Sequence, residues 1–211
     1  MRMAYHTRMN VFRSLVLLLC SFLGACVSAP PDNPANVCTI FEDNRSWYKA
    51  AQRAERQWQV PMSINMAILY QESSFKGRAK PPRRYYLGFI PGRRPSNAYG
   101  YAQALDSTWD EYRQAAGGWG ARRSNFGDAV DFVGWYNNRS NVINGIRKDD
   151  AYNLYLAYHE GNGGFRSGSW RNKDWLLQTA SSVQNNADRY AAQLRSCRSD
   201  LNRNWLMRLL F

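Results

Sequence analysis

One glutamate in this chain lies where a carboxyl group could act as a general acid. Glu72 closes an apolar run, Ile64 to Ser73, that has helical spacing and is followed by a loop rich in glycine and proline. Apolar and aromatic surroundings disfavour the charged form of a carboxyl group and raise its pKa, so that it can hold a proton for a leaving oxygen at neutral pH. Taken alone, an isolated glutamate near a helix end is more often a solvated surface residue or a capping partner, and the local sequence favours that interpretation.

Two further segments carry residues suited to binding a polar ligand. The first, Ala98 to Gln103, combines Gly100, which lets backbone approach a ligand closely, with an amide that both donates and accepts hydrogen bonds. The second, Ala157 to Asn162, ends a predicted helix in a polar turn, where the hydroxyl of Tyr158 could orient a carboxylic acid. The alternatives are that Gln103 satisfies backbone groups at a helix entry and that Tyr158 is a core aromatic.

The order of these three segments resembles the SLT-type lytic transglycosylases. In that family an E-S motif, a G-L-M-Q motif and an A-Y-N motif follow one another on a lysozyme-like helical fold. Here the motifs are Glu72-Ser73, then Gly100-Tyr101-Ala102-Gln103, then Ala157-Tyr158-His159. The resemblance spans about Trp47 to Leu194, which is most of the chain.

The resemblance implies a role for each matching residue. Glu72 would be the catalytic acid, Ser73 would lie beside it and the substrate acetamido group, and Tyr158 would donate the hydrogen bond that positions the carboxyl group. The remaining motif residues would contact sugar in the cleft: Gly100, Tyr101, Ala102, Gln103, His159 and Glu160. Tyr101-Ala102 replaces the usual Leu-Met and His159-Glu160 replaces the residues after A-Y, so subsite contacts are expected to differ.

The chemistry implied by the resemblance needs a single carboxyl group. Glu72 would protonate the oxygen between N-acetylmuramic acid and N-acetylglucosamine and then deprotonate the C6 hydroxyl, which closes a 1,6-anhydro ring without water. A two-carboxylate hydrolase needs a second acid, and Asp106 and Glu160 are the only acids near the motifs. No cofactor is implied. A histidine-based metal site is not expected, because His159 is the only histidine after the N-terminal segment.

The N-terminal segment predicts export. Arg2, Arg8 and Arg13 precede an apolar run that is too short to span a membrane comfortably, as in a signal peptide covering residues 1–25. Leu23-Gly24-Ala25-Cys26 resembles the bacterial lipobox, which implies lipidation of Cys26, and Val27 in the next position implies the outer membrane. Residues 26–37 would then form a tether. An ordinary secretory signal with a free Cys26 is the alternative.

With Cys20 and Cys26 assigned in this way, Cys38 and Cys197 are the pair left in an oxidising compartment. A disulfide between them would close a long loop around the predicted domain, residues 38–200, whereas two buried thiols are the alternative. This length supports one domain with one core.

The periodicity predicts a mostly α fold, similar to goose-type lysozymes, with long loops and at most a minimal β element. Ser63 is predicted to cap the helix that begins at Ile64, and Ser107 and Asp110 have the spacing of a capping box at the start of the next helix. Helices are expected over residues 47–58, 64–73, 106–117, 126–136, 149–158 and 174–194, and Tyr85 to Ile90 could pair with Ser96 to Gln103 as short strands.

Positive charge is abundant, with a formal net charge of +12 for the chain. It favours anionic partners, namely the cell wall or the membrane, and export makes nucleic acid a poor partner. The basic, aromatic segment 77–96 could line a groove for glycan or form a solvated flap. Residues 201–211 could form an amphipathic segment that meets a membrane or partner, such as cell-wall machinery, or could pack on the domain.

The resemblance thus predicts a periplasm-facing lytic transglycosylase anchored by lipid, with peptidoglycan as substrate. Two other classes stay open at this point: a lysozyme-like hydrolase that uses Glu160 or Asp106 as its second carboxylate, and a peptidoglycan-binding lipoprotein without catalysis.

Overall fold

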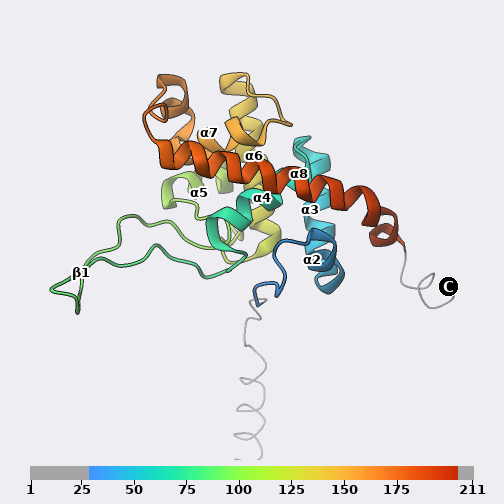
Figure 1. Ribbon diagram of the computed structural model, residues 1–211, viewed down its shortest axis with the longest axis horizontal. Coiled ribbons are helices and arrows are strands. Elements are labelled where there is room, and N and C mark those ends of the chain that lie inside the picture. The colour runs from blue at the N-terminus through green and yellow to red at the C-terminus, as the bar shows by residue number, and fades with distance from the viewer. Residues whose placement is uncertain (1–28, 204–211) are drawn as a thin grey trace, which may run out of the picture.

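A computed structural model describes residues 29–203. Within this range the chain folds into helices joined by long loops, with one hairpin that projects from the helical body (Figure 1). The prediction of a mostly α, lysozyme-like fold with a minimal β element is confirmed. In chain order the elements are α2 (Val37–Asp43), α3 (Arg45–Trp58), α4 (Met62–Ser73), β1 (Tyr85–Tyr86), β2 (Ile90–Pro91), α5 (Asp106–Tyr112), the π-helical turn η1 (Arg113–Gly117), α6 (Phe126–Asn144), α7 (Ala151–Ser167) and α8 (Asp174–Asn202).

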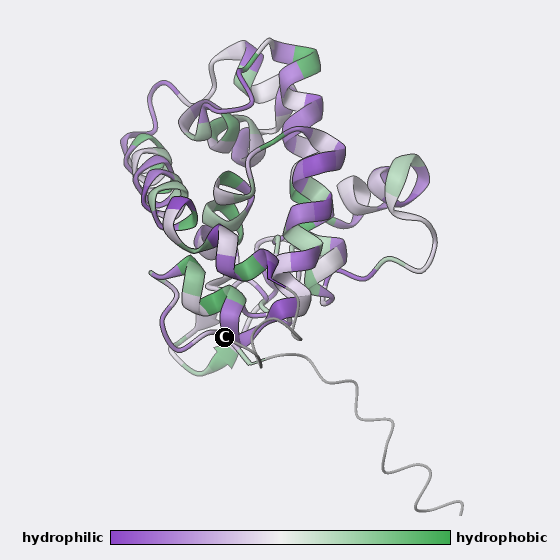
Figure 2. Ribbon diagram, turned by 90° about the vertical axis from the view of Figure 1, so that its right-hand side faces the viewer, coloured by the Kyte–Doolittle hydropathy of each residue, from purple (hydrophilic) through white to green (hydrophobic). Residues whose placement is uncertain are grey.

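Helix α4, which carries Glu72, runs through the centre of the fold. Its residues from Met62 to Leu69 are buried without interruption, so this part of the helix is enclosed on all sides. Most of the other helices carry hydrophobic and hydrophilic residues side by side along their lengths (Figure 2), as expected where one face packs inward and another meets solvent. The position of α4 is therefore fixed by packing on every side.

Close contacts between α3, α4 and α6 hold this centre together. A Cβ atom at Gly134 of α6 would lie 2.7 Å from the Trp58 ring, so only glycine permits this approach of the two helices. Asn137 of α6 donates a 3.2 Å hydrogen bond to Asn65 of α4. The carboxylate of Asp131 accepts from the Trp58 indole and from the Tyr112 hydroxyl, each at 2.8 Å, which ties α3 and α5 to α6.

The caps or the ends of five helices differ from those predicted. Helix α4 begins at Met62 after Pro61, and Ser63 is a buried residue inside it rather than its cap. Helix α5 has no side-chain cap, so the capping box predicted for Ser107 and Asp110 is wrong. Helices α6, α7 and α8 all extend beyond their predicted ends, to Asn144, Ser167 and Asn202.

The predicted strand pairing is also wrong. Tyr85 and Tyr86 pair with Pro91 and Ile90 in an antiparallel hairpin, so the chain reverses within residues 85–90, which were predicted to form one strand. In the segment 96–103, Tyr99 forms only an isolated bridge with Ala104. The Leu87-Gly88 turn explains the difference, because both residues have positive φ and reverse the chain.

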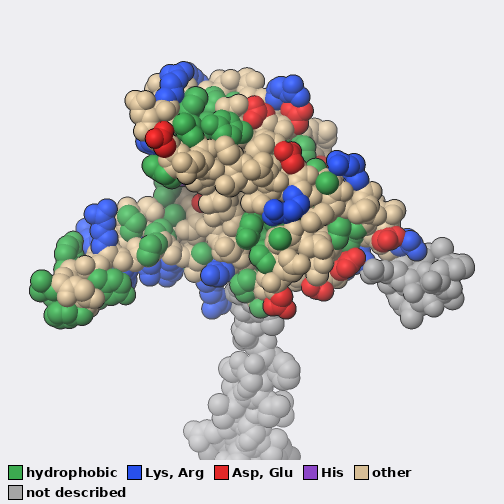
Figure 3. All heavy atoms as spheres, viewed as in Figure 1, with side chains coloured by type: hydrophobic (Ala, Val, Ile, Leu, Met, Phe, Trp, Pro, Cys, Tyr) green, Lys and Arg blue, Asp and Glu red, His purple; other side chains and the backbone are tan. Residues whose placement is uncertain are grey.

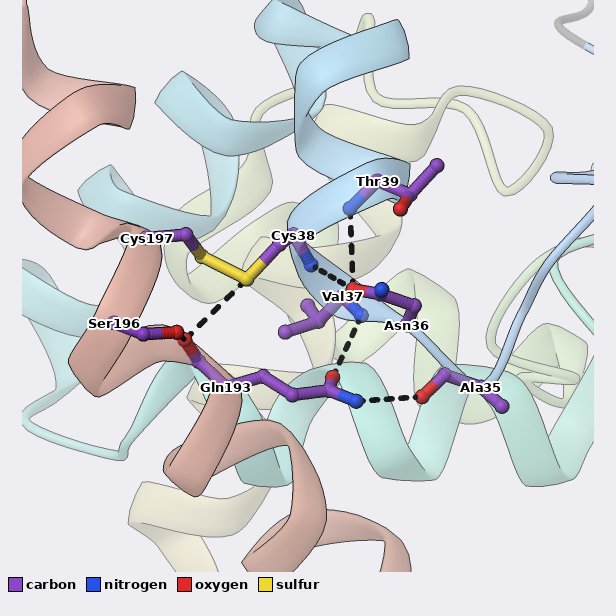
Figure 4. The surroundings of a disulfide bond; sticks show 8 residues. All are labelled: Ala35, Asn36, Val37, Cys38, Thr39, Gln193, Ser196 and Cys197. Atoms are coloured by element: carbon purple, nitrogen blue, oxygen red, sulfur yellow. Dashed lines mark hydrogen bonds between the residues drawn. A yellow bond between two sulfur atoms is a disulfide. The ribbon is translucent and has the colours of Figure 1, made fainter.

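The predicted disulfide between Cys38 and Cys197 is present and joins α2 to α8 (Figure 4). Gln193 of α8 strengthens the same junction, since its side chain accepts from the backbone of Val37 at 2.9 Å and donates to the carbonyl of Ala35 at 3.1 Å. All core residues of the described range lie between Val37 and Leu201. Residues 29–203 thus contain a complete hydrophobic core closed by a disulfide, and we expect them to fold as a unit.

Across residues 29–203, no helix combines the length and the apolar character needed to cross a bilayer. The predicted signal peptide, Cys26 and most of the predicted C-terminal segment lie outside the described residues.

Candidate active site

Glu72 lies in the last turn of α4, where the chain is held in an unusual conformation. The two residues after the helix, Ser74 and Phe75, both have left-handed backbone angles, with φ of 50° and 59°. Side chains other than glycine rarely adopt this conformation, and here tertiary packing enforces it. Phe75 is fully buried and its ring lies 5.9 Å from that of Trp47. The buried Phe75 therefore anchors the turn that presents Glu72.

Glu72 borders a cavity of about 530 Å³ between α4, α5, α6 and α7. Aromatic side chains form much of its wall, while backbone and polar groups of the loop before α5 form the rest. The lining residues are Glu72, Pro81, Ser96, Ala98, Gln103, Ala104, Leu105, Thr108, Phe132, Tyr136, Tyr158, His159, Glu160 and Gly161. A cavity of this volume can take part of a glycan.

The environment of Glu72 favours its protonated form. Burial raises the pKa of this carboxyl group from 4.5 to about 7, against the opposing effect of a hydrogen bond with the Tyr155 hydroxyl, which lowers it. A carboxylic acid with this pKa holds a proton in a substantial fraction of molecules at neutral pH and can also release it. The structure thus provides the property that the sequence pattern suggested for Glu72.

Tyr155 is the partner of Glu72 that sequence reasoning missed. Burial raises the pKa of its hydroxyl, and the nearby Glu72 raises it further, so Tyr155 stays a hydrogen-bond donor. Tyr155 precedes Tyr158 by three positions on α7, and residues at that spacing share one helix face. That spacing was the signal in the sequence that could have identified it.

Tyr158 has a different partner from the one expected. Its hydroxyl donates a 2.6 Å hydrogen bond to the backbone carbonyl of Ala102 rather than to Glu72. The ring packs edge to face on Tyr136 at 5.2 Å and borders the cavity. The role predicted for Tyr158, to position the carboxyl group by donating to it, is corrected: Tyr158 fixes the loop that contains Gln103, and Tyr155 interacts with Glu72.

In the loop from Gly100 to Gln103, only Gln103 borders the cavity. Gly100 has φ +83°, and a Cβ atom there would lie 2.1 Å from the carbonyl oxygen of Arg123, so glycine is required. The Tyr101 ring is buried and packs edge to face against the stacked rings of Trp47 and Phe126, and Ala102 is fully buried. The side chains of Tyr101 and Ala102 therefore belong to the core, which corrects their expected contact with substrate.

Gln103 faces the cavity and is held in place by backbone. Its amide nitrogen donates to the carbonyl oxygens of Gly100 at 2.8 Å and Ala79 at 3.1 Å. The amide nitrogen therefore satisfies backbone groups, while the residue also borders the cavity. Ser73, by contrast, is buried, and its hydroxyl donates to the carbonyl of Leu69 at 3.2 Å, away from the expected place beside the substrate.

The second acid of the cavity, Glu160, is held ionised. Burial raises its pKa, but hydrogen bonds from Lys173, Ser169 and His159 outweigh this and lower it to about 2. The ammonium of Lys173 lies 2.7 Å from the carboxylate, whose side chain is only 6 % exposed. Its neighbour His159 lies with Nδ1 3.1 Å from the same carboxylate and packs against the Trp175 ring.

Asp106 lies outside the cavity. Its carboxylate pairs with the Arg123 guanidinium at 2.6 Å and borders a separate surface hollow with Arg113 and Arg122. The structure therefore does not bring Asp106 together with Glu72.

A mostly helical domain with one glutamate of raised pKa at the wall of a cleft that contains aromatic side chains is the arrangement of a lysozyme-like domain that cleaves glycosidic bonds. The family model of the transglycosylase SLT domain matches residues 14–197. This chain belongs to that family, whose members are lytic transglycosylases of peptidoglycan. No curated protein and no solved structure matches the chain.

Proposed function

We propose that this protein cleaves the β-1,4 bond between N-acetylmuramic acid and N-acetylglucosamine in peptidoglycan, with Glu72 as the single acid and base. The observation that carries the proposal is the cavity position of Glu72 together with its pKa of about 7. A group that titrates near the working pH can both give and take a proton within one catalytic cycle.

In the first step protonated Glu72 donates its proton to the glycosidic oxygen, and the C1–O bond of the muramic acid residue breaks. The N-acetyl carbonyl of the same sugar stabilises the positive charge that develops at C1. The hydrogen bond from Tyr155 lowers the pKa of Glu72 and so stabilises the carboxylate that this step leaves behind.

In the second step the Glu72 carboxylate takes the proton of the C6 hydroxyl. The C6 oxygen bonds to C1, the 1,6-anhydro ring closes, and Glu72 is protonated again. Water is not consumed: the proton that Glu72 gives to the leaving oxygen is replaced by the proton of the C6 hydroxyl.

The properties of Glu160 argue against a hydrolase that uses it as a second carboxylate. A general base must accept a proton from water, and a carboxylate whose pKa is about 2 does this poorly. Both of its oxygens already accept hydrogen bonds from Lys173, at 2.8 and 2.7 Å. We assign Glu160 to holding the wall of the cleft.

We further propose that the protein is lipidated at Cys26 and faces the periplasm from the outer membrane. The lipobox-like sequence Leu23-Gly24-Ala25-Cys26 supports this location, and so does the disulfide, which requires an oxidising compartment.

The test is the release of soluble fragments from purified sacculi by residues 29–203, with Glu72→Gln beside it and the exposed Glu42→Gln as a matched control. The proposal predicts release by the native and Glu42→Gln proteins and loss of about 10²- to 10⁴-fold in Glu72→Gln. Equal release by all three proteins would remove Glu72 from the mechanism. No release by any of them would favour a binding role.

A further inference from the structure

The segment between α4 and the Gly100 loop forms an arm that reaches away from the helical body (Figure 1). Its end is the hairpin of β1 and β2, in which Tyr85 pairs with Pro91 and Tyr86 with Ile90. The turn spans Leu87, Gly88 and Phe89, of which the first two have φ of 51° and 79°. The arm meets the cavity only at its base, where Pro81 and Ser96 belong to the lining, so the hairpin does not form part of the glycan cleft. None of the basic or aromatic residues of segment 77–96 borders the cavity, so the groove predicted for them is not formed there.

The end of this arm is an exposed apolar surface. Leu87 is 82 % exposed, Phe89 72 % and Ile90 44 %, and the adjacent Tyr85 and Tyr86 are 60 % and 64 % exposed. In the space-filling view these hydrophobic side chains gather at the end of the arm (Figure 3). We call these five residues the hairpin tip. Five large apolar side chains held together in water mark a contact surface rather than scattered surface residues.

Positive charge borders the hairpin tip on both sides along the chain. Arg83 and Arg84 precede it, Arg93 and Arg94 follow it, and Arg78 and Lys80 lie nearer the base. The whole segment 77–96 contains no aspartate or glutamate. Figure 3 shows Lys and Arg side chains along the arm behind its apolar end. The arm is thus apolar at its end and cationic along its length.

This arrangement fits the boundary of an anionic lipid bilayer. Aliphatic and aromatic side chains at the end of an element bury their surface among acyl chains, tyrosines prefer the headgroup level, and arginines bind the lipid phosphates. Glycan is a poorer fit, since Leu87, Phe89 and Ile90 offer no side-chain hydrogen bonds to sugar hydroxyls. The turn also places Leu87 at positive φ, a conformation that is unfavourable for leucine. A leucine at this position does not stabilise the turn, so its presence is better explained by contact with a binding partner.

We propose that the hairpin tip inserts into the headgroup region of an anionic phospholipid membrane, with the flanking arginines on lipid phosphates. In Figure 1 the hairpin and the first described residues lie toward the same lower side of the helical body, so both could meet one membrane surface. The contact is a second membrane attachment, independent of the lipidation proposed for Cys26. The base of the arm borders the cavity through Pro81 and Ser96. Membrane attachment at the hairpin would therefore hold the cavity at a distance from the bilayer that the arm sets.

The experiment is co-sedimentation of residues 29–203, which carry no lipid, with vesicles of phosphatidylcholine alone or mixed with phosphatidylglycerol. The tip variant is Leu87→Ser combined with Phe89→Ser, which keeps all six cationic residues of the arm. The matched control is Trp119→Ser, because this tryptophan is 89 % exposed elsewhere on the surface. A second readout is an environment-sensitive dye attached to Leu87→Cys. The two native cysteines of residues 29–203, Cys38 and Cys197, are held in their disulfide and do not take the dye.

We expect native protein and Trp119→Ser to bind the anionic vesicles. The tip variant should bind at least about tenfold more weakly, because it loses the burial of two large apolar side chains, and the dye at position 87 should report an apolar environment. Equal binding by the tip variant, an unchanged dye signal, or hairpin-dependent binding to sacculi in place of vesicles would overturn the proposal. Glu72→Gln should bind vesicles like native protein, which keeps this test separate from that of the catalytic mechanism.

Discussion

Glu72 and Glu160 border the same cavity, and their pKa values are shifted in opposite directions. Burial raises the pKa of Glu72 to about 7, whereas Lys173, Ser169 and His159 lower that of Glu160 to about 2 despite its burial. At neutral pH one carboxyl group can therefore act as an acid while the other is a fixed negative charge in an ion pair. Different environments of two nearby carboxyl groups assign them different roles.

The first prediction concerns Glu160→Gln. This change removes the carboxylate that pairs with Lys173 but leaves an amide of similar shape, so the wall of the cleft should persist. We expect less than about a tenfold loss in the initial rate of sacculus solubilisation, compared with about 10²-fold or more for loss of the acid. A loss as large as that of Glu72→Gln, together with reducing sugar ends in the native product, would restore Glu160 as a catalytic base.

Glu72 should make the stability of the protein depend on pH. Its folded pKa of about 7 lies above the ordinary value of 4.5, so the folded state binds this proton more tightly than the unfolded state. The resulting stability is complete below the unfolded pKa and is lost as the pH rises through the folded one. The loss amounts to about 3 kcal/mol across this window.

The measurement is urea unfolding of native protein and Glu72→Gln at about pH 4 and about pH 8. The amide of the variant does not titrate, so its free energy of unfolding lacks this pH dependence. Between the lower and the higher pH, the variant should therefore gain about 2 to 3 kcal/mol of stability relative to native protein. A difference between the two proteins that does not change with pH would contradict the raised pKa.

Tyr155→Phe and Tyr158→Phe should separate two roles on one face of α7. Loss of the Tyr155 hydroxyl removes the hydrogen bond that lowers the pKa of Glu72, so the alkaline limb of the pH–rate profile should move to higher pH. Loss of the Tyr158 hydroxyl frees the Ala102 carbonyl and should lower the rate several-fold without moving that limb. If only Tyr158→Phe moves the limb, the assignment of the two tyrosines is reversed.

The disulfide should contribute strongly to stability. Cys38 and Cys197 are separated by 159 residues, and closing a loop of this length is worth about 5 kcal/mol in the chain-entropy model. The double variant Cys38→Ala and Cys197→Ala should unfold at a correspondingly lower urea concentration. A change below about 1 kcal/mol would mean that the junction of α2 and α8 is maintained by packing and by Gln193.

Much of the fold could be predicted because helical periodicity is a strong local signal, but the ends of the helices could not. Helix α6 continues past Tyr136 because two polar residues beyond it are buried and hydrogen-bonded. Asn137 donates to the side chain of Asn65, and Ser140 donates to the carbonyl of Tyr136. The sequence there is polar and reads as a helix end. In α7, Gly161 breaks the backbone with φ 77°, yet helical structure resumes after it. Tertiary contacts decide both cases.

The candidate site was predictable in part for a similar reason. The motif residues Glu72, Gln103, Tyr158, His159 and Glu160 all border the cavity. The burial of Tyr101 and the partner of the Tyr158 hydroxyl depend on contacts between segments far apart in the chain, so no local pattern specifies them. The spacing from Tyr158 places Tyr155 on the same helix face, but its hydrogen bond with Glu72 depends on how α7 packs near the end of α4.

The most direct test of the mechanism is mass spectrometry of the sugar ends that residues 29–203 release from sacculi in water enriched in heavy oxygen. The single-glutamate mechanism predicts muropeptides that end in 1,6-anhydro-N-acetylmuramic acid, contain no oxygen from the solvent, and are lost in Glu72→Gln. Reducing ends that carry heavy oxygen would contradict it and would establish a hydrolase that activates water.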